Sequence, residues 1–142
     1  MAANSRLTIA AHALAWLALA HRRGQEVLTS EQVAASVKSN AVVIRRSLGE
    51  LRRAGLVEVR HGAGAGWSLA RVPEGISLLE VHDAVDGRPP FALHHSEPNL
   101  ECPVGRGIRP ALSGVYGRVE QAMRRELAGV TIADVLRDVL RG

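Results

Sequence analysis

The sequence contains a single cysteine, Cys102, and this scarcity excludes two kinds of stabilising site. One thiol cannot form a disulfide within the chain, and it cannot build a zinc site from several thiolates of one chain. A chain of 142 residues needs neither, because it buries roughly two-thirds of its unfolded surface on folding. This length fits one compact domain, or a small domain with an oligomerisation element.

Long apolar runs are also missing. No run reaches the roughly 20 residues needed to span a bilayer, so we expect no membrane partner. The N-terminus alternates in polarity and carries a charge as early as Arg6, unlike a signal peptide. We therefore expect a cytoplasmic protein.

No sequence pattern supports catalysis or a cofactor. We find no Ser-His-Asp arrangement, no Gly-Lys phosphate-binding motif and no pair of carboxylates at a spacing typical of an active site. The glycines of segment 62–66 precede an expected strand rather than a helix, which makes a poor nucleotide loop. Trp16 and Trp67 either contribute to a small-ligand pocket or pack in the core, and packing is the simpler interpretation. We expect a binding protein and no enzyme.

Charge is divided unevenly along the chain. Up to Arg71 there are ten Lys/Arg against four Asp/Glu, a charge of +6, whereas the remainder carries eight against ten, a charge of −2. A basic first half indicates that this part of the protein meets a polyanion.

The apolar spacing of the first half predicts three helices. Residues 7–20 are apolar nearly all round, which is typical of a buried helix. Thr29, with Gln32 three residues later, predicts the N-terminal cap of the second helix. The third helix is expected over residues 41–54, with Gly55 as its C-terminal cap.

A β-hairpin is predicted to follow these helices. Residues 56–60 and 67–70 alternate apolar with polar side chains, as half-buried strands do, and segment 61–66 supplies a glycine-rich turn. The predicted order is two helices, a short break, a third helix and a hairpin. This is the order of elements in a winged helix-turn-helix. We expect this DNA-binding domain to cover residues 1–72, within a mainly α fold.

The second half is predicted to hold a linker and a helical dimerisation region, residues 73–142. Ser77 predicts the start of a short helix, and a long helix is expected over residues 103–127. Pro110 allows a kink or a late start in that helix. Thr131 predicts the cap of a last helix ending near residue 140. The long helix carries an apolar stripe at near-heptad spacing, which favours a partner helix; its expected dimer contacts are Ile108, Leu112, Val115 and Val119.

The third helix has the two faces that a helix in the major groove requires. Ile44, Leu48 and Leu51 form a stripe that packs inward, and the arginines lie off that stripe. The N-terminal part of such a helix reaches the base edges, free amides at its start bind phosphate, and a glycine-rich wing lies close to the sugar-phosphate strand. We therefore expect these contacts to double-stranded DNA: Ser39, Asn40, Val42, Arg45, Arg46, Arg52, Arg53, Arg60, His61 and Gly64.

Two other interpretations of these features stay open. One is a solvated arginine face beside an ordinary hairpin, and the other is a winged helix that binds proteins and not DNA. A steep dependence of DNA affinity on salt favours the DNA-binding interpretation, because contacts to several phosphates release counterions.

An ordered set of motifs resembles the Rrf-type (IscR/NsrR/CymR) transcription regulators of bacteria. The resemblance covers nearly the whole chain and lies in segments 4–8, 29–34, 42–46, 51–57, 67–70, 76–81, 86–87 and 102–106. It implies a homodimer that represses promoters by binding near-palindromic operators.

The chain departs from that family in its cysteines. Members that hold an iron–sulfur cluster usually carry three cysteines before the dimer helix, and here only Cys102 is present. A cluster bound by three thiolates of one chain is therefore excluded, and we expect no cofactor. Mixed ligation across a dimer, by Cys102 with His12, His94 or His95, is the less favoured alternative.

Cys102 itself is either a thiol-based sensor or a small packing residue. Pro103 suits the first position of a helix, which places Cys102 at the N-cap. Free amides and the helix dipole favour a thiolate there. Arg106, about one turn on, adds to this effect, and Glu101 opposes it.

Overall fold

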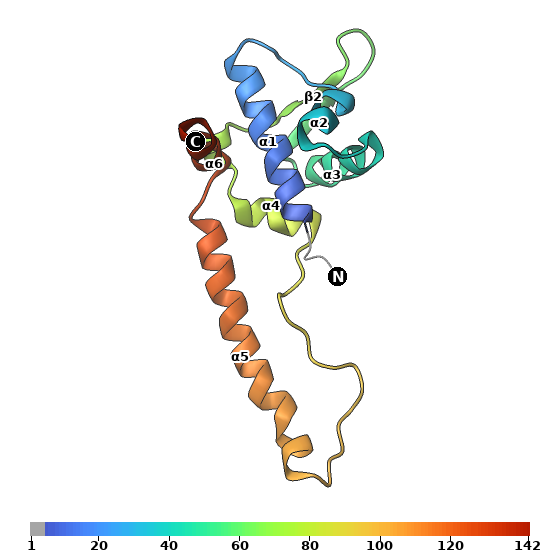
Figure 1. The fold of residues 1–142 in the computed structure, drawn as a ribbon, viewed down its shortest axis with the longest axis vertical. Coiled ribbons are helices and arrows are strands. Elements are labelled where there is room, and N and C mark those ends of the chain that lie inside the picture. Colours follow the sequence, from blue (N-terminus) through green and yellow to red (C-terminus); the bar gives the residue numbers. More distant parts are fainter. Residues whose placement is uncertain (1–4) are drawn as a thin grey trace. The chain divides into compact units, whose positions relative to one another are not determined.

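The computed structural model describes residues 5–142, and its elements follow the expected order (Figure 1). Asn4, which begins the N-terminal motif of the family resemblance, lies outside the described residues. The elements are α1 (Arg6–Arg22), α2 (Ser30–Val37), α3 (Ala41–Arg53), β1 (Val57–Arg60), β2 (Gly66–Leu69), the 3-10 turn η1 (Pro73–Gly75), α4 (Leu78–Val85), α5 (Pro103–Ala128) and α6 (Ile132–Arg141). The prediction of a mainly helical winged fold with one hairpin and a long C-terminal helix is confirmed.

Local capping signals set most of these boundaries. Reciprocal capping boxes start three of the helices: Thr29 opens α2, Ser77 opens α4 and Thr131 opens α6. At α2, for example, the backbone N–H of Gln32 donates to the Thr29 hydroxyl at 3.1 Å, and the Gln32 side-chain oxygen accepts from the Thr29 N–H at 2.9 Å. Each box satisfies two amides that a helix otherwise leaves without partners.

The described chain forms two compact units, which we consider separately. One unit comprises the described residues up to Gly87 together with Leu127–Gly142, and the other is Arg88–Glu126. The expected boundary after residue 72 therefore does not coincide with the packing, because α4 and α6 belong to the unit that holds the winged helix. Whether residues 73–142 mediate dimerisation stays a prediction.

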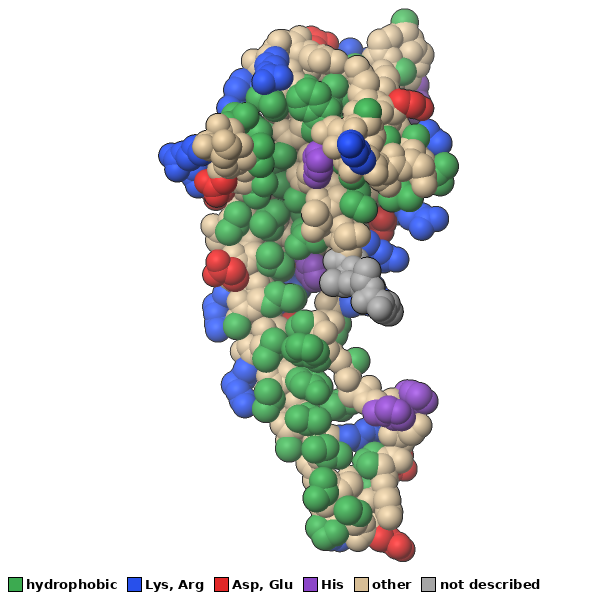
Figure 2. Space-filling view, in the orientation of Figure 1, with side chains coloured by type: hydrophobic (Ala, Val, Ile, Leu, Met, Phe, Trp, Pro, Cys, Tyr) green, Lys and Arg blue, Asp and Glu red, His purple; other side chains and the backbone are tan. Residues whose placement is uncertain are grey.

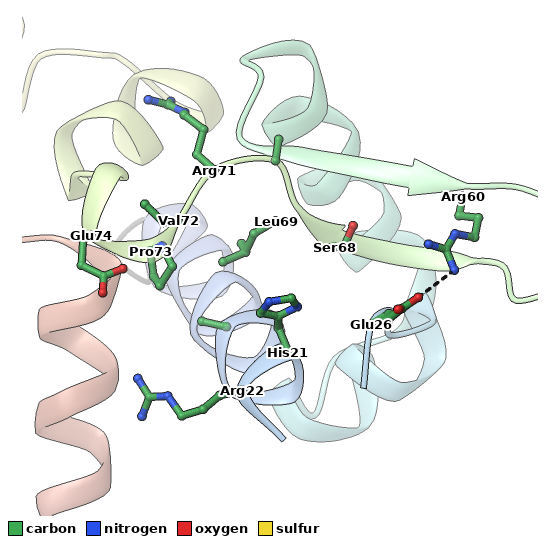
Figure 3. A pocket seen from close by; sticks show the side chains of 12 residues that line it. His21, Arg22, Glu26, Arg60, Ser68, Leu69, Arg71, Val72, Pro73 and Glu74 are labelled. Carbon is green, nitrogen blue, oxygen red and sulfur yellow. Dashed lines mark hydrogen bonds and ion pairs between the residues drawn. The ribbon is translucent and has the colours of Figure 1, made fainter. Parts of the chain in front are cut away.

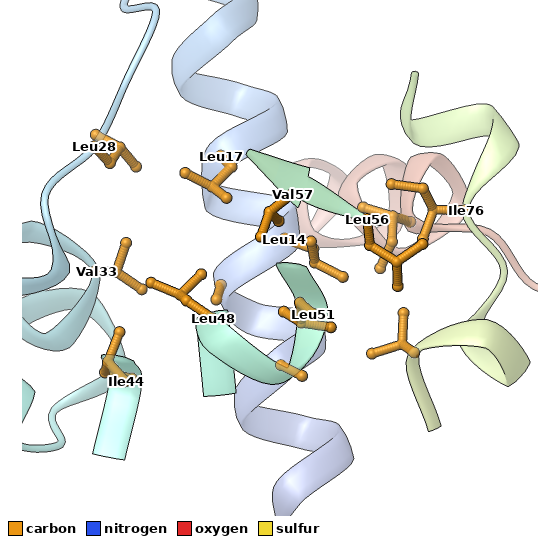
Figure 4. Close-up of a cluster of buried hydrophobic side chains, with 14 of the residues drawn as sticks. Leu14, Leu17, Leu28, Val33, Ile44, Leu48, Leu51, Leu56, Val57 and Ile76 are labelled. Carbon is orange, nitrogen blue, oxygen red and sulfur yellow. The ribbon is translucent and has the colours of Figure 1, made fainter. Parts of the chain in front are cut away.

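The core of the first unit surrounds α1, which contacts α2, α3, α4, α6 and β2. Figure 4 shows buried side chains of α1, α2, α3 and β1 gathered in one cluster, and Trp67 and Leu69 of β2 are partly buried against it. Leu14, Ile44, Leu48, Leu51 and Val33 are fully buried. Burial of each such side chain contributes roughly 1.5–3 kcal/mol, so the inward stripe of α3 is firmly held.

The last helix, α6, is tied to this unit by backbone hydrogen bonds. The N–H of Leu78 donates to the carbonyl of Val130 at 2.8 Å, and the N–H of Ile132 donates to the carbonyl of Ile76 at 2.9 Å. Ile132 and Leu136 are buried. The start of α6 is thus held against the start of α4, a pairing that the sequence pattern does not predict.

The long helix α5 runs without a break through Pro110. The sequence allowed either a kink at this proline or a late start of the helix near residue 108. The late start is wrong, because the helix begins at Pro103. Within residues 5–142, no helix is both long and apolar enough to cross a bilayer.

Candidate nucleic-acid interface

The entry into α3 is a three-residue turn with defined backbone geometry. Lys38 ends α2 in the left-handed conformation, with φ +60°, and the N–H of Ser39 donates to the carbonyl of Ala34 at 3.2 Å. Asn40 then caps α3, its side-chain oxygen accepting from the N–H of Val43 at 2.9 Å. This bond leaves the side-chain NH₂ of Asn40 available as a donor at the helix N-terminus.

Helix α3 separates a buried face from a basic exposed face. Ile44, Leu48 and Leu51 are 0 % exposed, whereas Val42 is 61 % exposed. The four arginines of the helix are all exposed: Arg45, Arg46, Arg52 and Arg53. The structure thus buries the apolar stripe of this helix and exposes its arginines, as the sequence predicted.

Two of the predicted DNA contacts are engaged by carboxylates of the same chain. A guanidinium nitrogen of Arg45 lies 3.4 Å from Glu31 at the start of α2, and Arg60 lies 3.3 Å from Glu26. Both pairs are largely exposed, and exposed pairs contribute only about 0.2–1 kcal/mol. A phosphate can therefore replace either carboxylate at little cost.

Three other arginines of this surface have no such competitor. Within residues 5–142, Arg46, Arg52 and Arg53 make no ion pair or hydrogen bond through their side chains. Their charge is directed to solvent, so this surface is positive without prior rearrangement.

The hairpin is anchored beside α2. Its strands pair antiparallel with Val59 opposite Trp67, and Trp67 also pairs with Leu28 in an isolated bridge. The Trp67 ring N–H donates to the hydroxyl of Ser30, the first residue of α2, at 3.1 Å. Trp67 and Trp16 both pack against the core, which favours the packing interpretation of these tryptophans.

The tip of the hairpin is exposed and turns through glycines. Gly62 and Gly64 adopt φ of +77° and +71°, values that strain other residues. His61 and Gly64 are exposed, as is Arg60 at the base of the tip. The first unit thus presents both predicted DNA-contacting segments, the start of α3 and the wing tip, at its surface.

The predicted dimer contacts lie on α5, in the second unit. No residue of this 26-residue helix is buried within the described chain. Val104, Ile108, Val115 and Val119 are among the exposed large hydrophobic side chains, and Leu112 is half-buried. Figure 2 shows hydrophobic side chains in a nearly continuous column over α5. Segment 92–98 lies beside Ile108 and Leu112, with which it lines one cavity, whereas Val115 and Val119 stay exposed within the described chain.

Cys102 lies directly before α5 and is exposed. Its carbonyl accepts from the N–H of Arg106 at 2.9 Å, so it occupies the cap position expected from Pro103. Hydrogen bonds from the backbone N–H groups of Gly105 and then Val104 lower the pKa of the Cys102 thiol. The position therefore favours a thiolate.

The three histidines of the alternative ligand set make local contacts. The His12 ring lies 2.8 Å from the Ser36 hydroxyl, and a His94 ring nitrogen accepts from the N–H of Ser96 at 3.0 Å. The rings of His94 and His95 stack with centroids 4.5 Å apart. Among the described residues, no three His, Cys, Asp or Glu side chains converge on a common point.

A groove of about 640 Å³ lies at the base of the wing (Figure 3). It is bounded by the C-terminal end of α1, by β2 and by segment 70–74, and Arg60 with its partner Glu26 stands at one end. The groove is open and its floor mixes apolar with charged groups, so it does not define a ligand by its chemistry.

The sequence analysis did not identify three residues of this surface. Glu31 and Glu26 lie 14 and 34 residues from the arginines that they pair with, and no local spacing indicates such contacts. Gly49 lies inside α3. The sequence did contain a signal for Gly49, because a glycine within an expected helix lowers the stability of that helix and calls for an explanation.

Comparison with known proteins supplies the context for this geometry. The model of the Rrf2 family, described as an iron-dependent transcriptional regulator, matches residues 3–138. The chain is 39 % identical over 133 residues to the candidate HTH-type transcriptional regulator YwnA of Bacillus subtilis strain 168. That alignment covers 94 % of this chain and 96 % of YwnA.

Solved structures agree with this match. The crystal structure of a candidate DNA-binding protein is similar with a TM-score of 0.73 and 37 % identity, over 93 % of this chain and 99 % of that one. CymR, the global cysteine regulator of B. subtilis, has a TM-score of 0.72 at 20 % identity, over 96 % of this chain and 97 % of its own. At that identity the likeness to CymR concerns the fold alone.

Proposed function

Because this chain belongs to the Rrf2 family of transcriptional regulators, whose members bind DNA, we propose that it is a homodimeric repressor of near-palindromic operators. The family is one of regulators and not of enzymes. The proposal goes beyond family membership in three respects: the residues that contact DNA, the assembly and the direction of regulation.

The observation that carries the proposal is the surface of α3. Its inward stripe is 0 % exposed, and its outward face carries Val42 and four exposed arginines. A helix held so firmly on one side can enter the major groove as a rigid body. We assign the start of the helix, with Arg45 and Arg46, to base edges or phosphates, and Arg52 and Arg53 to phosphates.

Two further segments extend this contact. Ser39 and Asn40 lie at the N-terminus of α3, where backbone amides and the helix dipole favour a phosphate. At the wing, Gly64 permits close approach to the sugar-phosphate strand, and Arg60 and His61 supply donors. Contacts from two elements fix the register of one unit on one half-site.

The exposed apolar face of α5 supports the assembly. We propose that Ile108, Leu112, Val115 and Val119 pair with the same residues of a second copy. The two-fold axis of such a dimer requires an operator of matching symmetry, with half-sites about 34 Å apart or a multiple of this distance. Repression is proposed as the direction of regulation because the resemblance to this family implies it.

Cys102 is proposed to respond to oxidants. Its exposure and the hydrogen bonds that lower its pKa favour the thiolate that reacts. The thiolate sulfur attacks one oxygen of hydrogen peroxide, the O–O bond breaks, and sulfenic acid and hydroxide form, so that the sulfur is oxidised and the peroxide is reduced by two electrons. A thiol of a second Cys102 or of a small molecule then displaces water and leaves a disulfide.

The experiment that tests DNA binding is selection of bound fragments from genomic DNA, first under reducing and then under oxidising conditions. The recovered operator is titrated with wild type and Arg46→Ala at several salt concentrations. We expect a steep salt dependence for wild type and a loss of about 1–3 kcal/mol for the variant if Arg46 reads a guanine. Recovery of no fragment, with retention of protein partners, would support the interaction-module alternative and refute this proposal.

A further inference from the structure

A glycine without a role in the fold lies on the exposed side of α3. Gly49 is the ninth of the 13 residues of this helix and has ordinary helical backbone geometry. Glycine within a helix loses more conformational entropy on folding than alanine does, and it weakens the helix. A feature that lowers stability at a central position needs a compensating reason.

Packing within the protein does not provide that reason. A Cβ atom placed on Gly49 would meet only the guanidinium of Arg53, at 3.8 Å, which is an ordinary contact with the end of a flexible side chain. Gly66 in β2 shows the opposite case, because a Cβ there would lie 2.9 Å from Val27 and from the carbonyl oxygen of Leu28. The fold requires glycine at 66 and tolerates a side chain at 49.

Helix geometry places Gly49 in line with the predicted DNA contacts. At 100° per residue, Val42, Arg46, Gly49 and Arg53 follow one line on the side opposite Ile44. The two arginines are exposed and are seven residues apart, about 10 Å along the axis. Between them Gly49 has no side chain and is partly exposed, and the Arg53 guanidinium lies 3.8 Å from the position that a Cβ would take. The line therefore contains a notch with a positive charge on each side.

We propose that this notch, at Gly49 between Arg46 and Arg53, receives the sugar-phosphate strand of the DNA at its closest approach to α3. The N-terminal residues of a groove-bound helix reach the bases. Gly49 lies in the third turn, where the helix leaves the groove past the flanking strand. The missing side chain lets a phosphate approach the backbone, and the two guanidinium groups offset its charge. This inference rests on the proposed DNA-binding function.

The test compares Gly49→Ala and Gly49→Leu with wild type. We expect both variants to raise the midpoint of thermal unfolding, by about 2–4 °C for alanine, because each improves the helix. Both should weaken binding to the operator and to an unrelated duplex alike, about tenfold for alanine and more for leucine. The slope of log affinity against log salt should lose about one unit in magnitude, since a phosphate contact carries no sequence information.

Gly117→Ala is the matched control. Gly117 is an exposed glycine of α5 on the side opposite Ile108, and a Cβ there would meet nothing within 4 Å. This control should gain stability without losing affinity for either duplex.

Three results would overturn the assignment. Unchanged affinity of both Gly49 variants would show that the notch is unused, and a loss limited to the operator would place a base edge there instead. Destabilisation by alanine would show that the fold itself needs this glycine. If wild type binds neither duplex, the proposed function fails and this inference fails with it.

Discussion

Replacement of Glu31 by glutamine should strengthen DNA binding while it weakens the fold. The carboxylate of Glu31 lies 3.4 Å from Arg45, and the side chains of this pair are 70 % and 50 % exposed, respectively. Arg45 must leave this partner before it can contact DNA. An exposed pair is worth about 0.2–1 kcal/mol, so Glu31→Gln should raise affinity by about 1.4- to 5-fold at 25 °C.

The same substitution should lower stability, for a separate reason. Glu31 lies in the first turn of α2, where its charge interacts favourably with the helix dipole. Loss of that charge costs about 0.3–1 kcal/mol. Opposite changes in affinity and stability distinguish this mechanism from a general loosening of the protein, which would lower both.

Fluorescence anisotropy with a labelled operator measures the affinity, and chemical denaturation measures the stability. Glu74→Gln is the matched control, since it removes the same charge from η1, and Glu74 makes no ion pair within the described residues. Affinity should rise for Glu31→Gln above any increase for Glu74→Gln. An unchanged or lower affinity for Glu31→Gln would show that the pair holds Arg45 in place for DNA and does not compete with it.

Three further predictions concern assembly, redox response and pH. Val115→Asp places a charge on the exposed face of α5 and should yield monomers in sedimentation with weak operator binding; tight binding by a monomeric wild type would contradict the proposed dimer. A mild hydroperoxide should lower operator affinity for wild type and not for Cys102→Ser, and equal responses would make Cys102 structural. The hydrogen bond from Arg71 lowers the pKa of Glu80, so the stability that this carboxylate contributes is present at neutral pH and is lost as pH falls through its folded pKa. Glu80→Gln should therefore flatten the acid limb of a stability–pH curve, and an unchanged curve would refute this role.

Much of the fold follows from neighbouring residues alone. The caps at Thr29, Ser77 and Thr131 and the stop at Gly55 depend on groups within four positions of each other, and such contacts form wherever the chain runs. The apolar period of α3 likewise separates its buried and exposed faces without reference to the rest of the molecule. The order of these elements was enough to predict a winged helix-turn-helix, and the motifs were enough to indicate the family.

Tertiary structure decided which distant residues meet. The return of α6 to the first unit depends on backbone bonds from Leu78 and Ile132, which lie more than 50 positions apart, and the amphipathic pattern of α6 fits any apolar surface equally well. The partners of Arg45 and Arg60 depend on how the helices and the wing pack, since an exposed carboxylate carries no sequence signal for a particular arginine. Gly49 combines both levels. The sequence shows that a side chain is missing, and only the folded structure shows that a side chain there would meet nothing but the flexible end of Arg53.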